Sequence, residues 1–527
     1  MLATLLSSTL AGLDGRVIRV EVDVAPGLPG FAIVGLPDTA LQEARERVRG
    51  AIRNAGFVHP PRRITVNLAP ADLRKTGASL DLAIALGILL GSEQVRAGGG
   101  RIGWIGELSL GGEVQAVPGT LPMVAALARR GVRQVVVARD SVDEARLAGD
   151  VAIVGVGSLR DATDVIRARR SRLRRAAPPR IELGLTEADP RLSQPAAIEP
   201  AILPAPDVPD LAEVRGQLEA RRALEIALAG GHGLLLIGPP GSGKTLLART
   251  IPGLLPPLDD GQALAATIVA SVAAERPIRS LVRAAPVRMP HHTLSYAAMV
   301  GGGPRLSPGE VTLADHGVLF LDELPEFSRD VLEALRQPLE DGHVSIARVG
   351  KATRFPARFQ FIAAMNPCPC GMAGSDDSSP CTCPPGMPER YARRISGPLR
   401  DRIDLWVTMP RVAPAAIVAA AEPEGSAVVA ERIATARLRQ TQRQAGQNGR
   451  LAGRRLRAAC RLSPGAERQT VRLATLEALS GRGTERLLRV ARTIADLAGA
   501  AAVESIHLDE AARYRSPAAR LERRVAG

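Results

Sequence analysis

The sequence predicts a protein of several domains with an α/β fold class, in which a core built on a parallel sheet is followed by a helical C-terminal region. Its 527 residues correspond to about three domains of ordinary size. In the middle of the chain, a glycine-rich loop lies between an apolar strand and a helical run, an arrangement typical of parallel sheets. The C-terminal part is rich in Ala, Arg and Leu, which favours helices.

Composition excludes some classes of protein and gives a weak hint about partners. Hydrophobic residues make up 46% and charged residues 23%, which excludes a disordered or fibrous chain. Lys and Arg number 68 against 54 Asp and Glu, and the net charge of +14 favours an anionic partner such as nucleic acid. Because the excess is almost entirely arginine in an Ala-rich chain, it also fits a bias of genome composition. Aromatic residues at 2% argue against base stacking as the main grip on single strands.

The sequence also indicates where the protein resides. No apolar run reaches the roughly 18–20 residues of a membrane span, and the longest, Leu80–Leu90, contains Asp81. Met1–Leu13 lacks the basic flank of a secretory signal. Five cysteines, four of them clustered, do not form the pattern of a disulfide framework. We therefore expect a cytoplasmic protein with no membrane contact.

By composition, the chain divides into four segments. Residues 1–166 mix apolar helices with alternating strands such as Arg16–Val24. Residues 167–209 carry first arginines and then prolines, and because both oppose packing we expect an exposed linker. Residues 210–410 hold strands, glycine loops and most of the chemistry, and residues 411–527 are predicted to be helical.

The glycine-rich loop has a specific chemical meaning. It fits the P-loop pattern completely and consists of Gly238, Pro239, Pro240, Gly241, Ser242, Gly243, Lys244 and Thr245. The apolar strand Leu234–Ile237 precedes it. Backbone N–H groups of such a loop surround phosphate oxygens, and the following helix adds partial positive charge. Lys244 would contact the β- and γ-phosphates of ATP, and Thr245 would ligate Mg²⁺.

A second motif complements the P-loop. The buried strand Val318–Leu321 ends in Asp322 and Glu323, some 80 residues after the loop. Alone, an apolar strand followed by acids is often only a strand edge. Beside a complete P-loop, we expect Asp322 to hold Mg²⁺ through water and Glu323 to orient the attacking water as general base.

Five further motifs make the interpretation more specific. They are Val214-Arg-Gly-Gln217, Gly230-Gly-His232, Pro290-His-His-Thr293, Val300-Gly-Gly-Gly303 and His316–Phe327. With these motifs the chain resembles the Mg-chelatase-like AAA+ ATPases of the YifB/ComM family over essentially its whole length. The resemblance implies a P-loop AAA+ core on a parallel sheet, a C-terminal helical lid, and ATP and Mg²⁺ as cofactors.

The same resemblance assigns roles to residues outside the two motifs. Asn366 matches the polar sensor-1 position, and Arg402 matches the arginine finger. Arg489 is the expected sensor 2 of the lid, with Arg482 and Arg492 as alternatives. For each arginine, a solvated helix face is the competing interpretation in so Arg-rich a chain. Because an arginine finger acts on the nucleotide of a neighbouring subunit, the resemblance implies a ring, for such motors usually a hexamer.

Residues 340–355 predict a further functional element. Alternation on both sides of Gly350 indicates a β-hairpin with Arg348, Lys351 and Arg354 near its tip. In this clade of AAA+ proteins a hairpin before sensor 1 projects into the ring pore. Basic groups repeated around a ring would follow a phosphate backbone without reading bases, so we expect DNA contacts here. An exposed, charge-protected hairpin is the alternative.

Two other features allow more than one interpretation. The stretch Arg432–Arg461 holds nine arginines and no acid, which fits a nucleic-acid surface or a solvated lid helix. Cys368, Cys370, Cys381 and Cys383 bracket a short polar loop, and four thiolates there suit tetrahedral Zn²⁺. Their C-x-C spacing is tighter than usual, and a redox-labile thiol pair or a loop without a ligand are the alternatives. By its place in the sequence, such a zinc ion is expected to support assembly rather than chemistry. Cys460 stands alone and is predicted to be a core residue.

The N-terminal segment, residues 1–166, resembles the proteolytic domain of Lon, an α+β fold. The likeness rests on Ala78–Ala85 and Gly106–Val137. Lon-type proteases need a serine that a lysine activates, but the flanking pattern places Gly77 and Leu121 at these two positions. A shift to Ser79 supplies no lysine, and Lys75, the only lysine of the segment, precedes the helix. We therefore expect a scaffold for assembly or DNA entry rather than a protease.

Taken together, these observations predict an ATP-driven hexameric motor that moves on DNA. The resemblance implies branch migration or helicase activity in recombination or natural transformation. A chelatase- or chaperone-like remodeller of a protein partner is the alternative, although no porphyrin site is recognisable in the chain.

Overall fold

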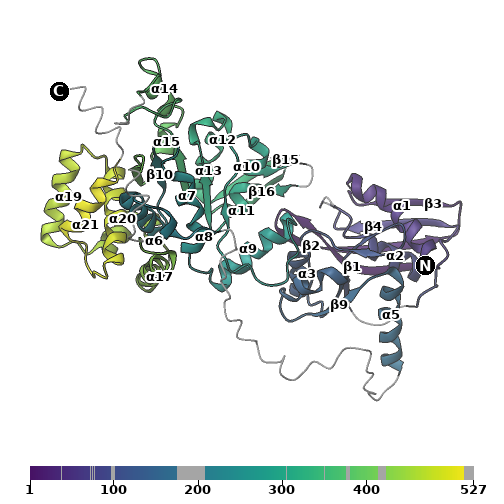
Figure 1. The fold of residues 1–527 in the computed structure, drawn as a ribbon. Helices are drawn as coiled ribbons and strands as arrows, with labels where there is room; N and C mark the ends of the chain where they lie inside the picture. Colours follow the sequence, from purple (N-terminus) through teal and green to yellow (C-terminus); the bar gives the residue numbers. More distant parts are fainter. Residues whose placement is uncertain are drawn as a thin grey trace.

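The computed structural model describes residues 1–36, 38–71, 73, 75, 77–96, 101–174, 208–303, 306–348, 351–374, 380–412, 423–444 and 446–515. Two sheets organise these residues (Figure 1). A seven-stranded sheet lies in the N-terminal part and a five-stranded sheet in the central part, with the C-terminal helices on the far side of the latter. This arrangement confirms the predicted α/β class with a parallel core sheet and a helical C-terminal region.

The N-terminal sheet has the order β3-β4-β2-β1-β5-β8-β9. Its strands are β1 (Leu2–Ala11), β2 (Asp14–Ala25), β3 (Gly30–Val34), β4 (Arg63–Ala69), β5 (Ile102–Trp104), β8 (Gln134–Ala138) and β9 (Ala152–Val156). A small pair, β6 (Glu107–Leu108) and β7 (Val114–Gln115), lies apart from it. In β2, Val20, Val22 and Val24 are buried while their neighbours are more exposed, which is the period of two expected of a half-buried strand.

The helices of this part are α1 (Thr39–Asn54), α2 (Asp81–Gly91), α3 (Thr120–Arg129), α4 (Val142–Arg146) and α5 (Leu159–Arg174). The predicted apolar helix corresponds to α2, which is almost wholly buried between the sheet and α1. Its one charged residue, Asp81, is paired with Arg47 at 2.7 Å. This pairing explains how a carboxylate is tolerated in an apolar helix.

The predicted linker begins later than the composition indicates. Helix α5 continues to Arg174 and therefore into the segment 167–209. The arginine run can still form a helix, because arginine has a high helix propensity. Residues 175–207 lie outside the described part of the chain.

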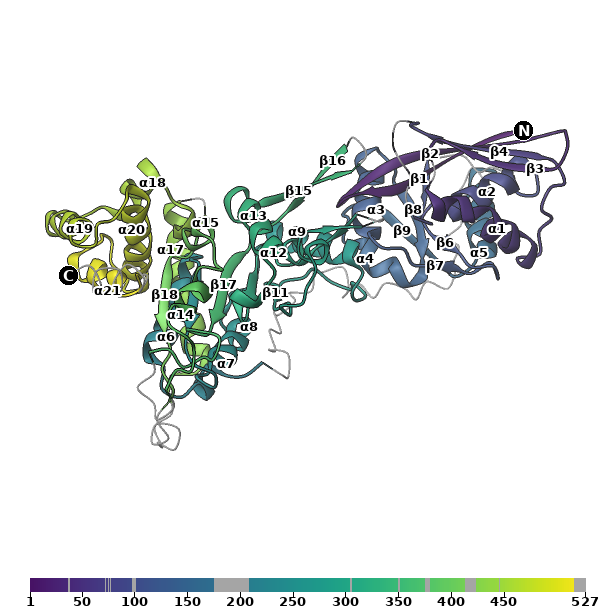
Figure 2. The same cartoon turned by 90° about the horizontal axis from the view of Figure 1, so that it is seen from above.

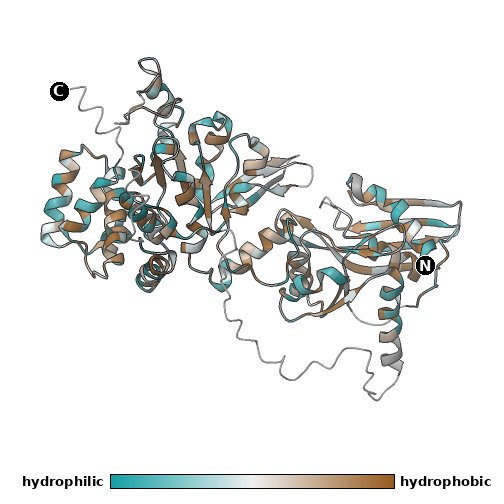
Figure 3. Cartoon of the chain, in the orientation of Figure 1, coloured by the Kyte–Doolittle hydropathy of each residue, from teal (hydrophilic) through white to brown (hydrophobic). Residues whose placement is uncertain are grey.

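The core sheet has the order β11-β14-β17-β10-β18. Its strands are β10 (Leu234–Ile237), β11 (Val287–Arg288), β14 (Val318–Leu321), β17 (Gln360–Met365) and β18 (Leu405–Thr408), and all neighbouring pairs are parallel. The central strands are continuous apolar runs, as expected of a sheet covered on both faces. Figure 3 shows this apolar colouring in the middle of the core.

Short helices surround this sheet. They are α6 (Leu218–Gly230), α7 (Lys244–Arg249), α8 (Ile251–Leu254), α9 (Asp260–Ala273), α10 (Tyr296–Val300), α11 (Glu310–Leu313), α12 (Arg329–Ala334), α13 (Arg336–Asp341), α14 (Met387–Ala392) and α15 (Gly397–Arg400). Two antiparallel pairs project from the core, namely β12 (Gly301–Gly302) with β13 (Ser307–Pro308), and β15 (His343–Arg348) with β16 (Lys351–Pro356). The second pair is the predicted hairpin, whose existence is thereby confirmed.

The C-terminal part is helical, as predicted. Its helices are α17 (Ser426–Arg443), α18 (Gly453–Cys460), α19 (Pro464–Leu476), α20 (Gly481–Leu497) and α21 (Ser505–Arg513). Their apolar faces join α6 and the core sheet in one continuous hydrophobic cluster. Cys460 is fully buried within it, which confirms the predicted core position. None of the helices in the described part of the chain has the length and apolar character needed to cross a membrane.

The N-terminal part contacts the core at two places (Figure 2). Glu144 accepts hydrogen bonds from the hydroxyl of Ser271 at 2.6 Å and from Leu121 N at 2.8 Å. Burial raises the pKa of Glu144, although these hydrogen bonds act in the opposite direction. The β1–β2 turn lies against the hairpin, where a Cβ added to Gly12 would be 2.5 Å from Thr353 Cγ2. The hairpin is therefore in contact with a second domain.

Candidate nucleotide and metal sites

The P-loop joins the carboxyl end of β10 to α7. Gly241 and Gly243 adopt φ values of +78° and +90°, which favour glycine. Among the described residues, no heavy atom lies within 4 Å of the place where a Cβ would stand on either glycine. The loop backbone therefore borders open space, as a phosphate-binding cradle requires.

Lys244 lies at the centre of this loop. Its Nζ donates to the carbonyl oxygens of Gly238 and Pro239 at 2.8 and 2.9 Å, and to Asn366 Oδ1 at 3.2 Å. Burial lowers the pKa of Lys244, while the nearby Asp322 and Glu323 act to raise it. The predicted sensor-1 residue and the P-loop lysine are thus brought into direct contact.

The two residues expected to hold Mg²⁺ also meet. Thr245 Oγ1 donates to Asp322 Oδ2 at 2.5 Å, and Asp322 Oδ1 accepts from Glu323 N at 2.9 Å. A hydroxyl and a carboxylate in contact are hard oxygen ligands of the kind that Mg²⁺ prefers. The donor set fits a magnesium nucleotide, with the loop for the phosphates and this pair for the metal.

Glu323 has a second partner that the sequence did not indicate. His292, in the loop after β11, places Nδ1 3.3 Å from Glu323 Oε2. Glu323 itself has φ +50°, a left-handed conformation that is uncommon outside glycine. His292 also packs against His291, with ring centroids 4.1 Å apart. The candidate general base therefore has an imidazole nitrogen as a close side-chain partner.

Arg402 lies at the other end of the core sheet. It precedes β18, whose pairing matches Leu405 with Leu234 at one end and Thr408 with Ile237 at the other. The P-loop follows Ile237, so the length of a four-residue strand, about 13 Å, separates Arg402 from the loop. Arg402 Nη2 instead pairs with Glu340 Oε2 at 3.0 Å. This arginine faces away from the nucleotide site of its own chain.

Three lid arginines differ in their surroundings. Arg489 Nη2 lies 3.5 Å from Asp404 Oδ1, and Arg482 lines the same groove as Arg402 and Arg489. Arg492 is 1% exposed and pairs with Asp496 at 2.9 Å, which favours a core position over the alternative sensor role. The groove contains a further arginine, Arg486, which pairs with Asp401 at 3.3 Å, and the sequence analysis did not single it out.

The hairpin positions are described only in part. The register of β15 and β16 places Arg348 opposite Lys351 and Ser345 opposite Arg354, and Arg354 is exposed. The side chains of Arg348 and Lys351, and the tip at Val349 and Gly350, lie outside the described part of the chain. The predicted DNA contacts therefore remain predictions.

The first half of the basic stretch Arg432–Arg461 binds protein groups. Arg432 pairs with Glu225 and Glu424, Arg437 donates to Leu228 O, and Arg443 pairs with Asp496. These contacts attach α17 to α6 and α20. They favour the structural interpretation over a nucleic-acid surface for this half.

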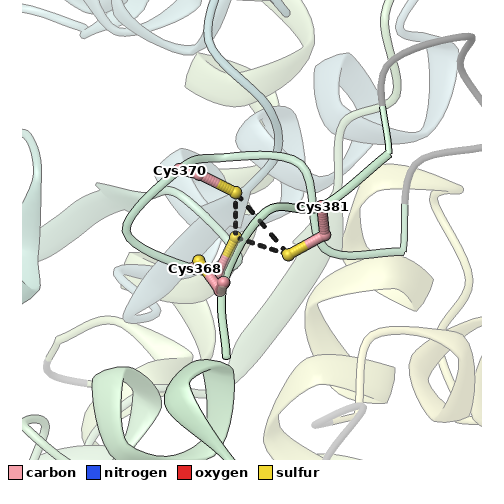
Figure 4. Close-up of side chains that lie close together, drawn as sticks. Cys368, Cys370 and Cys381 are labelled. Atoms are coloured by element: carbon pink, nitrogen blue, oxygen red, sulfur yellow. Dashed lines mark hydrogen bonds between the residues drawn. The ribbon is translucent and has the colours of Figure 1, made fainter. Parts of the chain in front are cut away.

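The four clustered cysteines converge, and Figure 4 shows Cys368, Cys370 and Cys381 pointing toward one another. Their sulfurs all lie within 4.8 Å of one another, and Cys368 Sγ is 3.3 Å from Cys370 Sγ and 3.8 Å from Cys381 Sγ. A zinc ion would hold ligand sulfurs about 3.8 Å apart. Backbone N–H groups of Met372 and Thr382 hydrogen-bond Cys370 and lower the pKa of its thiol to about 5, whereas burial and hydrogen bonds to neighbouring thiols raise the pKa of Cys381 and Cys383. The geometry fits a tetrahedral thiolate site.

Comparison with known proteins identifies the family. Three family models match the chain. The model described as magnesium chelatase, subunit ChlI, matches residues 210–417. The model for subunit ChlI of Mg-chelatase matches residues 20–141, and the model for the C-terminal part of subunit ChlI matches residues 423–515. The chain is 40% identical to the uncharacterized protein YifB of Escherichia coli over 96% of its own length and 95% of the relative's. It is 38% identical to the competence protein ComM of Haemophilus influenzae, over 98% and 97% of the two chains.

The chain belongs to the YifB/ComM family of Mg-chelatase-like AAA+ ATPases. The family assignment supports ATPase activity with ATP and Mg²⁺. A 66-residue segment, 12% of this chain and 8% of the relative, is also 39% identical to the maternal DNA replication licensing factor mcm3 of Xenopus laevis.

Within this YifB/ComM chain, the two Lon positions carry no protease chemistry. Gly77 has φ +78° and its N–H donates to Asp38, and Leu121 is buried in α3. The hydroxyl of Ser79 is buried and donates to Ser8 O at 2.9 Å. Lys75 is fully buried and donates to the carbonyl of Pro70. The contacts of these four residues are those of residues that stabilise the fold, not those of a catalytic serine and lysine.

Two of the family motifs have contacts that the sequence does not reveal. Gln217 closes the motif Val214–Gln217, and its side-chain amide donates to Ser242 O at 3.0 Å and Pro410 O at 2.6 Å. It thereby ties the P-loop to the segment after β18. His292 belongs to the second motif, and its neighbour Glu323 was already singled out. In both cases the motif was visible, but the partner is distant in sequence.

Proposed function

We propose that the protein is an ATP-hydrolysing motor that assembles as a hexamer and acts on DNA. Its activity would be branch migration or helicase activity in recombination or natural transformation. The name of the ComM relative, a competence protein, and that of the mcm3 relative, a DNA replication licensing factor, support this direction.

One observation carries the proposal. The P-loop, Thr245–Asp322, Glu323 and Asn366 converge at the carboxyl edge of the core sheet, whereas Arg402 lies at the opposite edge. A phosphoryl-transfer site needs positive charge on the transferring group. In this arrangement that charge is supplied by another subunit, which supports a ring.

Each residue then has a distinct task. Lys244 and the loop amides hold the phosphates, Thr245 and Asp322 hold Mg²⁺, and Glu323 orients the attacking water. Asn366, bonded to Lys244, fixes the lysine relative to the end of β17. When bound, Mg²⁺ neutralises charge on the phosphates.

The arginines complete the neighbouring site. Arg402 acts as the arginine finger, and Arg489 acts as sensor 2 from the same groove, with Arg482 as the remaining alternative. Because both lie at the edge away from the P-loop, both would act on the neighbour's nucleotide. Glu340 holds Arg402 until a neighbour binds.

The remaining segments have supporting roles. The hairpin with Arg348, Lys351 and Arg354 contacts the phosphates of DNA in the ring pore. The N-terminal segment, residues 1–166, is a scaffold for assembly or DNA entry, and residues 167–209 connect it to the core at 210–410 and the lid at 411–527. Cys368, Cys370, Cys381 and Cys383 bind Zn²⁺. The protein works in the cytoplasm.

A branch-migration assay tests the proposal. A labelled four-way junction is incubated with the protein, ATP and Mg²⁺, and the products are compared with those of Lys244→Ala. The wild type should convert the junction to duplex products, and Lys244→Ala should not, because it lacks the charge that holds the phosphates. A wild type that hydrolyses ATP without DNA stimulation and leaves the junction intact would favour remodelling of a protein partner instead.

A further inference from the structure

The cysteine loop lies against the P-loop. Gly371, in the turn that begins at Cys368, has φ +82°, and its N–H donates to Cys368 O at 2.9 Å. A Cβ added to Gly371 would overlap the ring of Pro240, lying 2.8 Å from its Cγ. The backbone of the cysteine loop is therefore packed directly on a P-loop residue, and only glycine allows this approach.

The same loop is attached to the nucleotide site through the chain. The P-loop residue Gly238 donates its N–H to Met365 O at 3.2 Å, at the end of β17. The next residue, Asn366, accepts from Lys244 at 3.2 Å. Only Pro367 separates Asn366 from Cys368, which is fully buried. Cys368, a candidate metal ligand, thus lies two positions after Asn366, the residue that contacts the P-loop lysine.

The cysteine loop has few apolar residues with which to form a core of its own. Cys368 is buried, but Cys370 and Cys383 are half-buried and Cys381 is exposed. Its internal contacts include hydrogen bonds from backbone N–H groups to sulfur, such as Ala373 N to Cys368 Sγ at 3.2 Å. A segment of this kind is ordered by a bound metal rather than by a core.

We propose that a zinc ion held by the four cysteines braces the P-loop, so that metal occupancy sets the affinity of the nucleotide site. This rests on the proposed function, since it takes residues 238–245 to bind ATP. The contact of Gly371 with Pro240 transmits the effect. The metal therefore acts on nucleotide binding, rather than on assembly as its place in the sequence suggests.

The physical basis is the fraction of molecules in which the P-loop has a conformation that can bind nucleotide. With zinc bound, the turn at Gly371 is fixed and limits the conformations of Pro240 and its neighbours. Without zinc, the loop backbone samples more conformations, and the apparent dissociation constant rises in inverse proportion to the competent fraction. A competent fraction of about one tenth would raise it about tenfold.

The first experiment compares the full-length protein before and after zinc removal. Zinc is measured by elemental analysis, hydrogen exchange is followed at residues 238–245 without nucleotide, and the affinity for a non-hydrolysable ATP analogue with Mg²⁺ is measured. We expect about one zinc per chain, faster exchange of the loop amides after removal, and a dissociation constant about tenfold higher. Both changes should reverse when zinc is restored.

The second experiment tests the contact with the metal retained. Gly371→Ala places a methyl group against Pro240, and Gly374→Ala is the matched control, because Gly374 has φ +70° but no described heavy atom within 4 Å of an added Cβ. We expect Gly371→Ala to keep its zinc while showing faster exchange at the P-loop and weaker binding of the analogue. Gly374→Ala should resemble the wild type.

Two results would overturn the inference. A zinc content far below one per chain would show that the cysteines hold no structural zinc. Unchanged hydrogen exchange of residues 238–245 in both the zinc-free protein and Gly371→Ala would show that the cysteine loop does not affect the P-loop. Failure of the proposed function gives a different result, since a zinc-loaded wild type would then bind no analogue while the exchange difference persisted.

Discussion

The two edges of the core sheet contrast sharply. At the carboxyl edge, acidic and polar groups gather around a lysine, and Lys244, Thr245, Asp322 and Asn366 are connected by hydrogen bonds. At the amino edge, Arg402 lies in a groove with four lid arginines, Arg450, Arg482, Arg486 and Arg489, and is paired with an acid. One edge has the groups that fit phosphates and metal, and the other carries the cations that we propose stabilise the transferring phosphate of a neighbour.

The contrast supports the proposal that a second chain completes the hydrolytic site. An arginine about one strand length from the P-loop cannot approach a phosphate bound there. Two chains placed edge to edge would bring the groove of one to the loop of the other. A repeated contact of this kind closes a ring when the rotation fits.

The largest effect is expected from Arg402→Ala. Removal of an arginine finger typically lowers turnover by about 10³-fold or more, because the developing charge loses its partner. Affinity for ATP should change little, since Arg402 is remote from the P-loop of its own chain. Steady-state hydrolysis and nucleotide binding are the measurements.

Arg393→Ala serves as the control for this variant, since Arg393 is exposed and close in sequence. Turnover of Arg402→Ala at the wild-type level would show that the groove at the amino edge has no part in hydrolysis. It would leave the contrast between the two edges without a function.

A smaller effect is expected at the hairpin. Lys351→Ala should weaken binding of DNA by about three- to tenfold and reduce the salt slope by about one, because one phosphate contact per chain is lost. Basal hydrolysis should stay nearly intact, since β16 lies apart from the P-loop. Fluorescence anisotropy over a range of salt concentrations measures both quantities.

Lys351→Arg, which keeps the charge, should preserve most of the affinity. If Lys351→Ala bound DNA as tightly as the wild type, the hairpin would have to be removed from the pore model, and the contact with DNA would lie elsewhere.

The smallest effect is expected at His292. Its contact with Glu323 is partly exposed, and exposed pairs contribute at most about 1 kcal/mol, so His292→Ala should change turnover by at most about fivefold. We expect basal hydrolysis to rise and DNA stimulation to fall, because Glu323 is freed from a partner that holds it. ATPase rates with and without DNA check this, and a fall in basal rate would show that His292 positions Glu323 for catalysis instead.

The sequence was sufficient to predict where the P-loop and the acids after β14 lie, at the carboxyl edge, but not where Arg402 lies, at the amino edge. The P-loop and the acids after β14 are local patterns whose chemistry fixes their place on a parallel sheet. The position of Arg402 depends on β18 pairing beside β10, which no local pattern determines. The order of strands decides which residues share an edge, and this order is a property of the whole domain.

Contacts between distant segments were missed for the same reason. Gly371 on Pro240 and His292 on Glu323 each join loops whose approach depends on tertiary packing. Arg492 is an alternative sensor by sequence because its spacing in α20 is like that of its neighbours. Only the structure shows that it is turned into the core and paired with Asp496.

Mixing two inactive variants tests the central claim most directly. Glu323→Gln keeps a normal amino edge, and Arg402→Ala keeps a normal carboxyl edge, so each alone should be unable to hydrolyse ATP. In an equal mixture, about a quarter of the interfaces would combine the two intact edges, and hydrolysis should return to about that fraction of the wild-type rate. Mixed assemblies that show no recovery would contradict the account, because Arg402 would then not act on a neighbour's nucleotide.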